Sequence, residues 1–212
     1  MVKIKEQPYS VLAIGPHPDD IEYGCAGTLR KFVLKGHHVY LMLMSQGDMG
    51  GDAETRKKEQ LNSAKVLGIK EVFWGGYLDT CIPLDKEIIT KIENVIHKIK
   101  PTFVFVNHKE DTHQDHRNVA VATVSATRYS KNLLYYEVPT TENFSPHVYV
   151  DIEKFMDKKL DSLKAHHSQV KKTNIKGLDI VHGATSNATF RGIQARVRYA
   201  EAFMPSRLFF NI

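Results

Sequence analysis

The 212-residue sequence predicts a doubly wound α/β fold, a three-layer sandwich in which helices cover both faces of a mainly parallel sheet. Two observations predict this class. The first is that short apolar runs alternate with longer segments of helical periodicity. The second is that these runs are almost continuously apolar, which is typical of strands that are buried on both faces of a parallel sheet. We find no internal repeat and no Pro/Ser-rich linker, so we expect a single domain over residues 1–212.

The first half of the pattern begins with "YSVLAIG" (9–15), which we interpret as a buried strand. A helix is expected in "IEYGCAGTLRKFVLKG" (21–36), ending near Gly36 because glycine commonly follows a helix C-terminus. "HVYLMLMS" (38–45) is the second strand. It runs into the glycine-rich loop "QGDMGGD" (46–52), whose backbone freedom suits either a plain turn or a loop near a substrate.

The alternation then continues through three more predicted strands. A helix at 53–68, stopped by Gly68, precedes the strand "EVFWGG", and a helix at 86–100, ended by Pro101, precedes "TFVFVN". A further helix leads to the fifth strand, "NLLYYEVP". These three strands occupy 71–76, 102–107 and 132–139.

The pattern is less regular after Pro139. We expect a late strand in "HVYVDI" (147–152), a helix in "EKFMDKKLDSLKAHH" (153–167) and a last helix in "RGIQARVRYAEAFM" (191–204). The predicted fold is therefore Rossmann-like, with its ligand site at the carboxyl ends of strands one and four, where the order 3-2-1-4-5 reverses direction.

Composition excludes several classes of protein. With 42% hydrophobic and 25% charged residues, the chain has the composition of an ordinary globular domain. The net charge of +5 comes from lysines scattered among acids, so we expect no nucleic-acid partner. No apolar stretch is long enough for a membrane span, and no signal-peptide pattern is present. Two cysteines do not make a disulfide framework, so we expect a cytoplasmic protein, which we also expect to form homo-oligomers.

Histidines and acids are densest in the loops that follow the first and fourth predicted strands. "PHPDD" follows the first, and "HKEDTHQDHRN" follows the fourth. Two imidazoles and one carboxylate, with a position left for water, make a catalytic zinc site, and His17, Asp20 and His116 can supply them. Zinc would make its water more acidic, and an uncoordinated carboxylate is then needed to take the proton, a role that suits Asp19. The end of strand three also brings Trp74, Tyr77 or Asp79 near the crevice.

These residues carry a family resemblance. "PHPDD" after the first strand, together with "HQDH" after the fourth, resembles the PIG-L / LmbE-like zinc-dependent de-N-acetylases. "YGCAGTL", "TRKKEQLNSAKVLG", "KAHHSQV" and "RVRYAEAFMP" are also similar to segments of that family, so the resemblance spans most of the chain.

The resemblance implies a role for each matching residue. His17, Asp20 and His116 correspond to the zinc ligands, and Asp19 to the general base. His113 matches a histidine that stabilises the oxyanion or protonates the leaving amine.

Two further positions are implied less directly. Asp115 is expected to orient a histidine. Arg56 matches an arginine that binds substrate.

The expected activity is hydrolysis of a linear amide: a zinc-dependent N-deacetylase that releases acetate from an N-acetylglucosamine-type sugar. The attached group stays open among malate, inositol, a lipid, a second sugar and a nucleotide. One alternative is a metal-dependent phosphoesterase, for which Asp111 and His108 could help hold a second metal. Another is a nucleotide- or cofactor-binding module without hydrolysis, although the first loop lacks G-x-G-x-x-G. One zinc per chain favours the deacetylase, two metals the phosphoesterase, and none the binding module.

Overall fold

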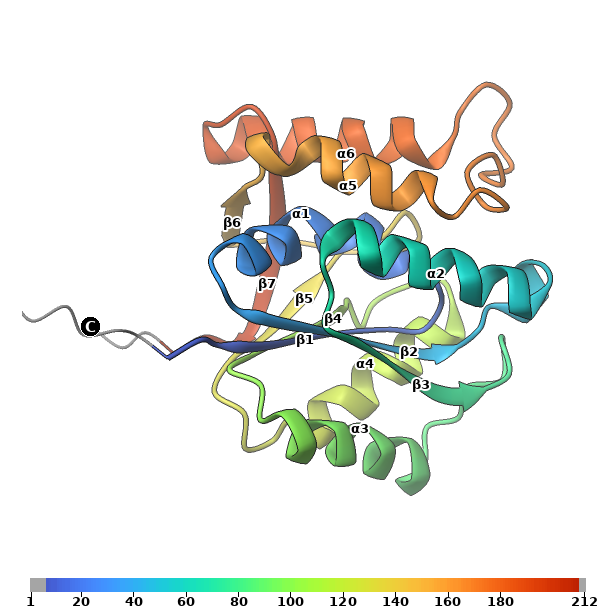
Figure 1. The fold of residues 1–212 in the computed structure, drawn as a ribbon, viewed down its shortest axis with the longest axis vertical. Helices are drawn as coiled ribbons and strands as arrows, with labels where there is room; N and C mark the ends of the chain where they lie inside the picture. Colours follow the sequence, from blue (N-terminus) through green and yellow to red (C-terminus); the bar gives the residue numbers. More distant parts are fainter. Residues whose placement is uncertain (1–6, 210–212) are drawn as a thin grey trace, which may run out of the picture.

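The computed structural model describes residues 7–209 and contains a seven-stranded sheet in the order β3-β2-β1-β4-β5-β7-β6 (Figure 1). β1 pairs in parallel with both β2 and β4, so the chain winds outward in both directions from β1. This confirms the doubly wound topology and the predicted order of the first five strands. Those strands are β1 (Ser10–Gly15), β2 (His38–Ser45), β3 (Glu71–Tyr77), β4 (Phe103–Asn107) and β5 (Leu133–Tyr136).

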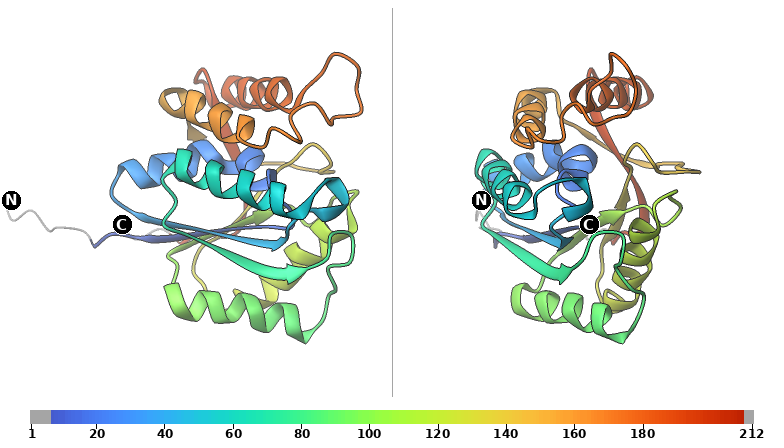
Figure 2. Two further views of the ribbon diagram at one scale, coloured as in Figure 1. Left: turned by 45° about the vertical axis from the view of Figure 1, so that its right-hand side comes forward. Right: turned by 90° about the vertical axis from the view of Figure 1, so that its right-hand side faces the viewer.

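Helices cover both faces of this parallel part. Successive residues of β1 point to opposite faces, so Val11 packs in the core beneath α1 and Leu12 packs against α3 and α4. α5 and α6 form a second tier outside α1 and α2 (Figures 1 and 2). The helices are α1 (Asp20–Leu34), α2 (Ala53–Leu67), α3 (Lys86–Ile99), α4 (Gln114–Ala126), α5 (Met156–Lys164) and α6 (Ile180–Ala195).

A close approach between α1 and β5 sets the position of α1 on the sheet. A Cβ atom on Gly24 would lie 2.1 Å from the ring of Tyr136, so only glycine fits at that point. The Tyr136 hydroxyl in turn donates a 2.9 Å hydrogen bond to the carbonyl of Ile14 in β1. The tyrosine thus fills the space between helix and sheet and fixes the start of α1, which follows the β1 loop directly.

The last predicted helix is wrong. The helix in this region is α6, which ends at Ala195, and residues 200–207 form β7 (Ala200–Arg207), antiparallel to both β5 and β6 (Val148–Asp151). Pairing on both sides overrides the helical propensity of the Ala-Glu-Ala sequence at 200–202. Glu201 is buried on β7, where it accepts hydrogen bonds from the backbone of Gly27 and Thr28 and lies 2.7 Å from the ammonium of Lys159.

Three smaller features complete the description. Short 3₁₀ helices occupy Asp48–Gly50 and Glu153–Phe155. Cys25 is buried and Cys81 exposed, and both are free thiols. No helix in the described part of the chain is long and apolar enough to cross a membrane.

Candidate metal centre

The loops after β1, β3 and β4 meet at one end of the sheet, the right-hand end in Figure 1, which faces the viewer in the right panel of Figure 2. The loop after β1 carries His17 and Asp19, and Asp20 is the first residue of α1. The loop after β4 leads into α4, which carries His116 in its first turn. The two loops richest in histidine and acid are therefore adjacent.

His17, Asp20 and His116 converge on one point. Asp20 Oδ2 lies 3.4 Å from His17 Nδ1 and 3.4 Å from His116 Nε2, and all three side chains are buried. The potential ligand atoms of the three residues lie within 4.8 Å of one another. Ligand atoms at about 2.0–2.1 Å from one tetrahedral zinc would be separated by about 3.3–3.4 Å. The spacing and the His₂–Asp donor set therefore fit a zinc ion.

The outer nitrogen of each histidine faces a carboxylate. His17 Nε2 lies 2.8 Å from Asp79 Oδ1 and 3.1 Å from Asp115 Oδ2. His116 Nδ1 lies 3.1 Å from Asp111 Oδ2. A proton on each outer nitrogen leaves the inner nitrogen with a free lone pair, which is the usual arrangement behind a metal-bound histidine.

A second group of possible ligands, His17, Asp79, His113 and Asp115, uses the outer nitrogen of His17. There the 2.8 Å contact between His17 and Asp79 is a hydrogen-bond distance, shorter than two ligands of one zinc ion would keep. Asp115 is also occupied, since it accepts from the backbone of Thr80 at 2.7 Å and of Ile82 at 3.2 Å. We therefore assign these carboxylates to holding His17 rather than to a second metal.

The electrostatics of the centre favour a bound cation. Burial opposes protonation of His17, but its hydrogen bonds with Asp115, Asp20 and Asp79 outweigh burial and raise its pKa. Burial would also raise the pKa of Asp20, yet His116 and His17 bring it down to about 2. Carboxylates that stabilise positive charge this strongly suit a divalent ion.

Asp19 differs from its neighbour in backbone and environment. Its φ of 90° lies in the left-handed region, so the chain turns sharply there and sends the two adjacent aspartates in different directions. Burial, with a further contribution from the charge of Asp20, raises the pKa of Asp19 to about 6. The guanidinium of Arg56, with Nη2 3.4 Å from Asp19 Oδ2, opposes that rise.

Arg56 is held by the loops around it. It is 4% exposed, and its guanidinium donates to the carbonyl of Gly47 at 2.7 Å and to that of Pro18 at 2.8 Å. These bonds tie the glycine-rich loop to the loop after β1. The structure thus places Arg56 against Asp19, and its predicted contact with substrate stays a prediction.

His113 is the N-cap residue of α4. Its Nδ1 accepts from the backbone N–H of Asp115 at 3.2 Å, so in the neutral ring the proton is on Nε2. Burial, together with the charges on His17 and His116, lowers the pKa of His113. Its ring centroid is 4.9 Å from that of His17 and 5.0 Å from that of His116. His113 is therefore a neutral hydrogen-bond donor beside the centre.

Sequence reasoning did not predict that Asp79 and Asp111 face the outer nitrogens of His17 and His116. Asp79 was expected only near the crevice, and Asp111 only as a ligand of a second metal. Both follow carboxyl ends of strands, which is a usable signal, but their pairing with particular histidines depends on contacts between distant loops.

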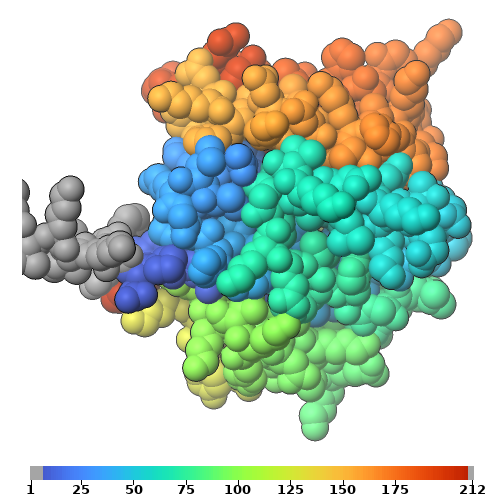
Figure 3. All heavy atoms as spheres, in the orientation of Figure 1, coloured from blue at the N-terminus to red at the C-terminus, as the bar shows by residue number. Residues whose placement is uncertain are grey.

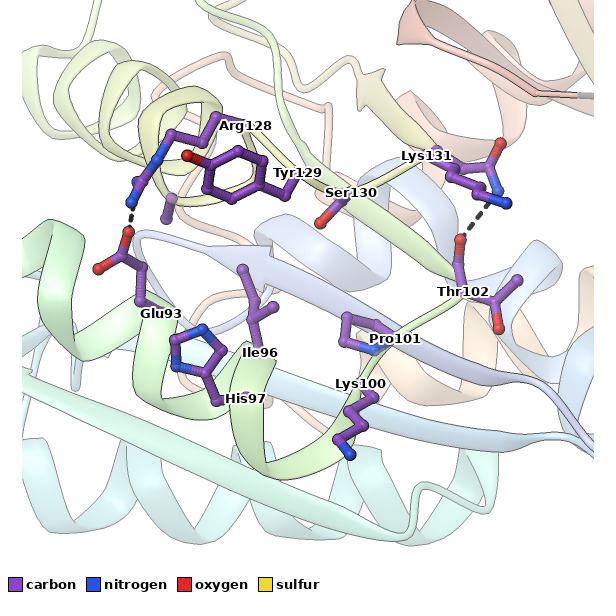
Figure 4. A pocket seen from close by; sticks show the side chains of 12 residues that line it. Glu93, Ile96, His97, Lys100, Pro101, Thr102, Arg128, Tyr129, Ser130 and Lys131 are labelled. Carbon is purple, nitrogen blue, oxygen red and sulfur yellow. Dashed lines mark hydrogen bonds and ion pairs between the residues drawn. The ribbon is translucent and has the colours of Figure 1, made fainter.

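Two cavities bear on the location of the site. One of about 630 Å³ lies where β4 begins, between the C-terminal ends of α3 and α4, and is lined by His97 and Tyr129 among others (Figure 4). It is at the opposite end of the sheet from the metal centre. Another, of about 570 Å³, has Asp19 in its wall. Of the two, the second is therefore the one that reaches the loop carrying Asp19.

The fold and this centre define an α/β protein whose described residues form a candidate His₂–Asp metal site at the switch point of the sheet. Residues 12–127 match the model of the PIG-L family, described as GlcNAc-PI de-N-acetylase, and the chain belongs to this family. The resemblance in the sequence is thereby confirmed.

Individual proteins support the assignment. The chain is 35% identical over 167 residues to the uncharacterized deacetylase YaiS of Escherichia coli K12, covering 74% of this chain and 90% of that protein. Its fold is similar to that of the conserved protein TT1542 from Thermus thermophilus, with TM-score 0.86, 25% identity and coverage of 96% and 97% of the two chains. It is also similar to the N,N'-diacetylchitobiose deacetylase of Pyrococcus horikoshii in complex with its inhibitor MPG, with TM-score 0.80, 27% identity and coverage of 93% and 83%.

Proposed function

We propose that the chain is a zinc-dependent hydrolase that removes the N-acetyl group from an N-acetylglucosamine-type sugar or its conjugate. The observation that carries the proposal is the convergence of His17, Asp20 and His116 beside an uncoordinated Asp19. Family membership and the names of relatives in that family support deacetylation as the reaction. When bound, zinc would supply positive charge that polarises the acetamide carbonyl and makes water more acidic.

In this proposal Asp19 is the general base. A carboxylate with a pKa near 6 is ionised at neutral pH and still basic enough to accept a proton during attack by water. Its neighbour Asp20 is held ionised at much lower pH by His116 and His17, which suits a ligand rather than a base. In this proposal Asp20 binds the zinc and Asp19 accepts the proton.

His113 and Arg56 have supporting roles. The Nε2–H of neutral His113 can donate a hydrogen bond to the oxyanion that develops on the acetamide oxygen. The proton held by Asp19 then passes to the departing amine, so that acetate and the free amino sugar are released. Arg56 orients Asp19 by its contact at 3.4 Å and is also proposed to contact the sugar.

The two alternatives are less well supported. A phosphoesterase with two metals would need ligands from Asp111 or His108, but Asp111 lies on the outer nitrogen of His116 and His108 Nδ1 lies 3.4 Å from the carbonyl of Glu110. A non-hydrolytic nucleotide site would place phosphates at the switch point, where Asp19 and Asp20 carry negative charge.

The test is acetate release from a panel of N-acetylglucosaminides, with metal analysis of the same preparation. We expect one zinc per chain, release of acetate in step with free amine, and loss of activity on chelation that returning zinc restores. Zinc at one equivalent without acetate from any sugar would contradict the proposed reaction. We also propose that the chain forms a single domain over 1–212, that it assembles into homo-oligomers and that it is cytoplasmic. Sedimentation velocity tests the assembly.

A further inference from the structure

The cavity beside Asp19 is built mainly by a part of the chain outside the metal centre. Its walls are Tyr23 of α1, the turn at 139–140 after β5, the connection 165–179 between α5 and α6, and the first turns of α6. That connection lies at the same end of the molecule as the carboxyl ends of the parallel strands (Figure 1, orange).

The connection is fastened to the rim of the metal centre. Gln169 Nε2 donates to the carbonyl of Gly50 at 3.2 Å, and the ammonium of Lys172 donates to the same oxygen. Ser168 donates through both its backbone N–H and its hydroxyl to the carboxylate of Glu59 on α2, at 2.8 and 2.7 Å. Figure 3 shows the orange connection packed on the cyan segment that contains the glycine-rich loop. The cavity wall therefore has a defined position relative to Asp19.

The surface of this cavity is largely apolar. Ile175 and Leu178, both on the connection, are 61% and 37% exposed although they line it, and Ile180 and Pro139 add further apolar surface. Large aliphatic side chains left exposed around a concave site mark a place for an apolar ligand group.

The charged groups of the wall are already partnered. Apart from Asp19, the charged residues that line the cavity are Lys172 and Asp179. Lys172 is bonded to Gly50, and Asp179 accepts from the backbone of His182 at 2.8 Å while its carboxylate lies 2.9 Å from that imidazole. Lys171 and Lys176 line a neighbouring depression that does not include Asp19. No arginine in the described residues lines the cavity, so it offers no bidentate guanidinium for a carboxylate or phosphate, and Lys172 already donates to Gly50.

We propose that this cavity receives the group attached to the N-acetylated sugar, and that this group is an uncharged alkyl or aryl aglycone. The inference rests on the proposed function, since Asp19 must face the acetamide for the reaction to occur. With the acetamide at Asp19, the rest of the substrate continues along the wall formed by Tyr23, Ile175 and Leu178. A cavity of about 570 Å³ is large enough for a small ligand group of this kind.

Affinity measured by calorimetry on the zinc-loaded protein tests the inference without relying on turnover. The Asp19→Asn variant is used so that the acetylated sugar persists. We compare methyl, hexyl and carboxymethyl N-acetylglucosaminides. Burial of a methylene is worth roughly a fourfold gain in affinity, so partial burial of the hexyl chain gives at least about a tenfold gain over the methyl glycoside. The carboxymethyl glycoside is expected to bind no better than the methyl one.

Variants locate the effect. Ile175→Ser and Leu178→Ser each reduce the hexyl-to-methyl affinity ratio severalfold, because they weaken binding of the hexyl glycoside more than that of the methyl glycoside. Leu34→Ser is the matched control, because Leu34 is 60% exposed, like Ile175, but lies at the far end of α1. The control keeps the wild-type ratio.

Two results overturn the inference. One is equal affinity for hexyl and methyl glycosides, including no binding of either. The other is tightest binding of the carboxymethyl glycoside. The proposed function fails separately, if the wild-type protein binds these sugars with the expected ratio and releases acetate from none of them.

Discussion

Asp79 Oδ1 lies 2.8 Å from His17 Nε2, on the side of the imidazole ring opposite the nitrogen that faces Asp20. This contact joins the loop after β3 to the loop after β1. It orients the ring so that Nδ1 points toward Asp20 and His116. A carboxylate outside the group formed by His17, Asp20 and His116 thus takes part in building the candidate centre.

We therefore predict that Asp79→Ala lowers zinc affinity by roughly 10–100-fold, because the His17 ring loses one of the groups that fix its orientation and its proton. Competition with a chromophoric chelator measures this. Glu87→Ala on the exposed surface of α3 is the control and keeps wild-type affinity. Unchanged affinity in Asp79→Ala would show that Asp115 alone is sufficient to orient His17.

Asp19 and Asp20 are expected to respond differently to the same substitution. Asp20→Asn weakens zinc binding, because a charged ligand is lost. Asp19→Asn keeps zinc and the fold but slows acetate release by about 10²–10⁴-fold, as expected when a general base is removed. Metal analysis and an acetate assay on the two purified variants decide the matter. The opposite pattern, with zinc lost from Asp19→Asn and both zinc and activity kept in Asp20→Asn, would reverse the two roles.

Arg56→Gln should move the acidic limb of the pH–rate profile. The guanidinium holds down the pKa of Asp19, and the base works in its ionised form. Removing Arg56 raises that pKa, so the acidic limb of kcat/KM shifts to higher pH, by roughly one unit for an adjacent arginine. Substrate contact by Arg56 adds a rise in KM. An unmoved acidic limb would count against the coupling of Arg56 with Asp19.

A buried pair behind the centre gives a prediction for stability. His166 Nε2 lies 3.6 Å from Glu22 Oε1, and both residues are almost fully buried. Burial opposes ionisation of each, but the interaction with Glu22 raises the pKa of His166, and that with His166 lowers the pKa of Glu22. The histidine contributes stability that is fully present below its ordinary pKa of 6.5 and is lost as the pH rises through its raised pKa. The glutamate contributes stability that is fully present above its ordinary pKa of 4.5 and is lost as the pH falls through its lowered pKa.

Both contributions are present between about pH 4.5 and 6.5. We expect His166→Gln to cost about 3 kcal/mol of unfolding free energy in that window and progressively less at higher pH. Urea unfolding at several pH values, with exposed His167→Gln as control, measures the difference. A cost that is independent of pH would mean that the pair is not ionised in the folded protein.

Local sequence patterns were sufficient to predict the parallel strands and the helices between them. β1 and β2 are apolar between their end residues, and Gly68 and Pro101 end or follow helices where expected. The histidines and acids of the centre could be brought together because the carboxyl ends of neighbouring parallel strands share one edge of the sheet.

The misses have a common physical origin in distant contacts. The segment that forms β7 begins with Ala-Glu-Ala, which favours a helix, and its strand depends on pairing with β5 and β6. The buried carboxylate of Glu201 depends on Lys159, and that of Asp79 on His17. None of these partners is near in sequence, so no local pattern reports them.

The connection between α5 and α6 has a consequence for how this protein could diversify. The proposed metal ligands and the carboxylates behind them all lie between residues 17 and 116, whereas most of the cavity wall comes from residues 139–183. In the proposed enzyme, reactivity and selectivity are thus encoded in separate stretches of the gene. Recombination or a loop graft confined to 171–178 could retarget the enzyme to a different conjugate while its hydrolytic machinery is inherited unchanged.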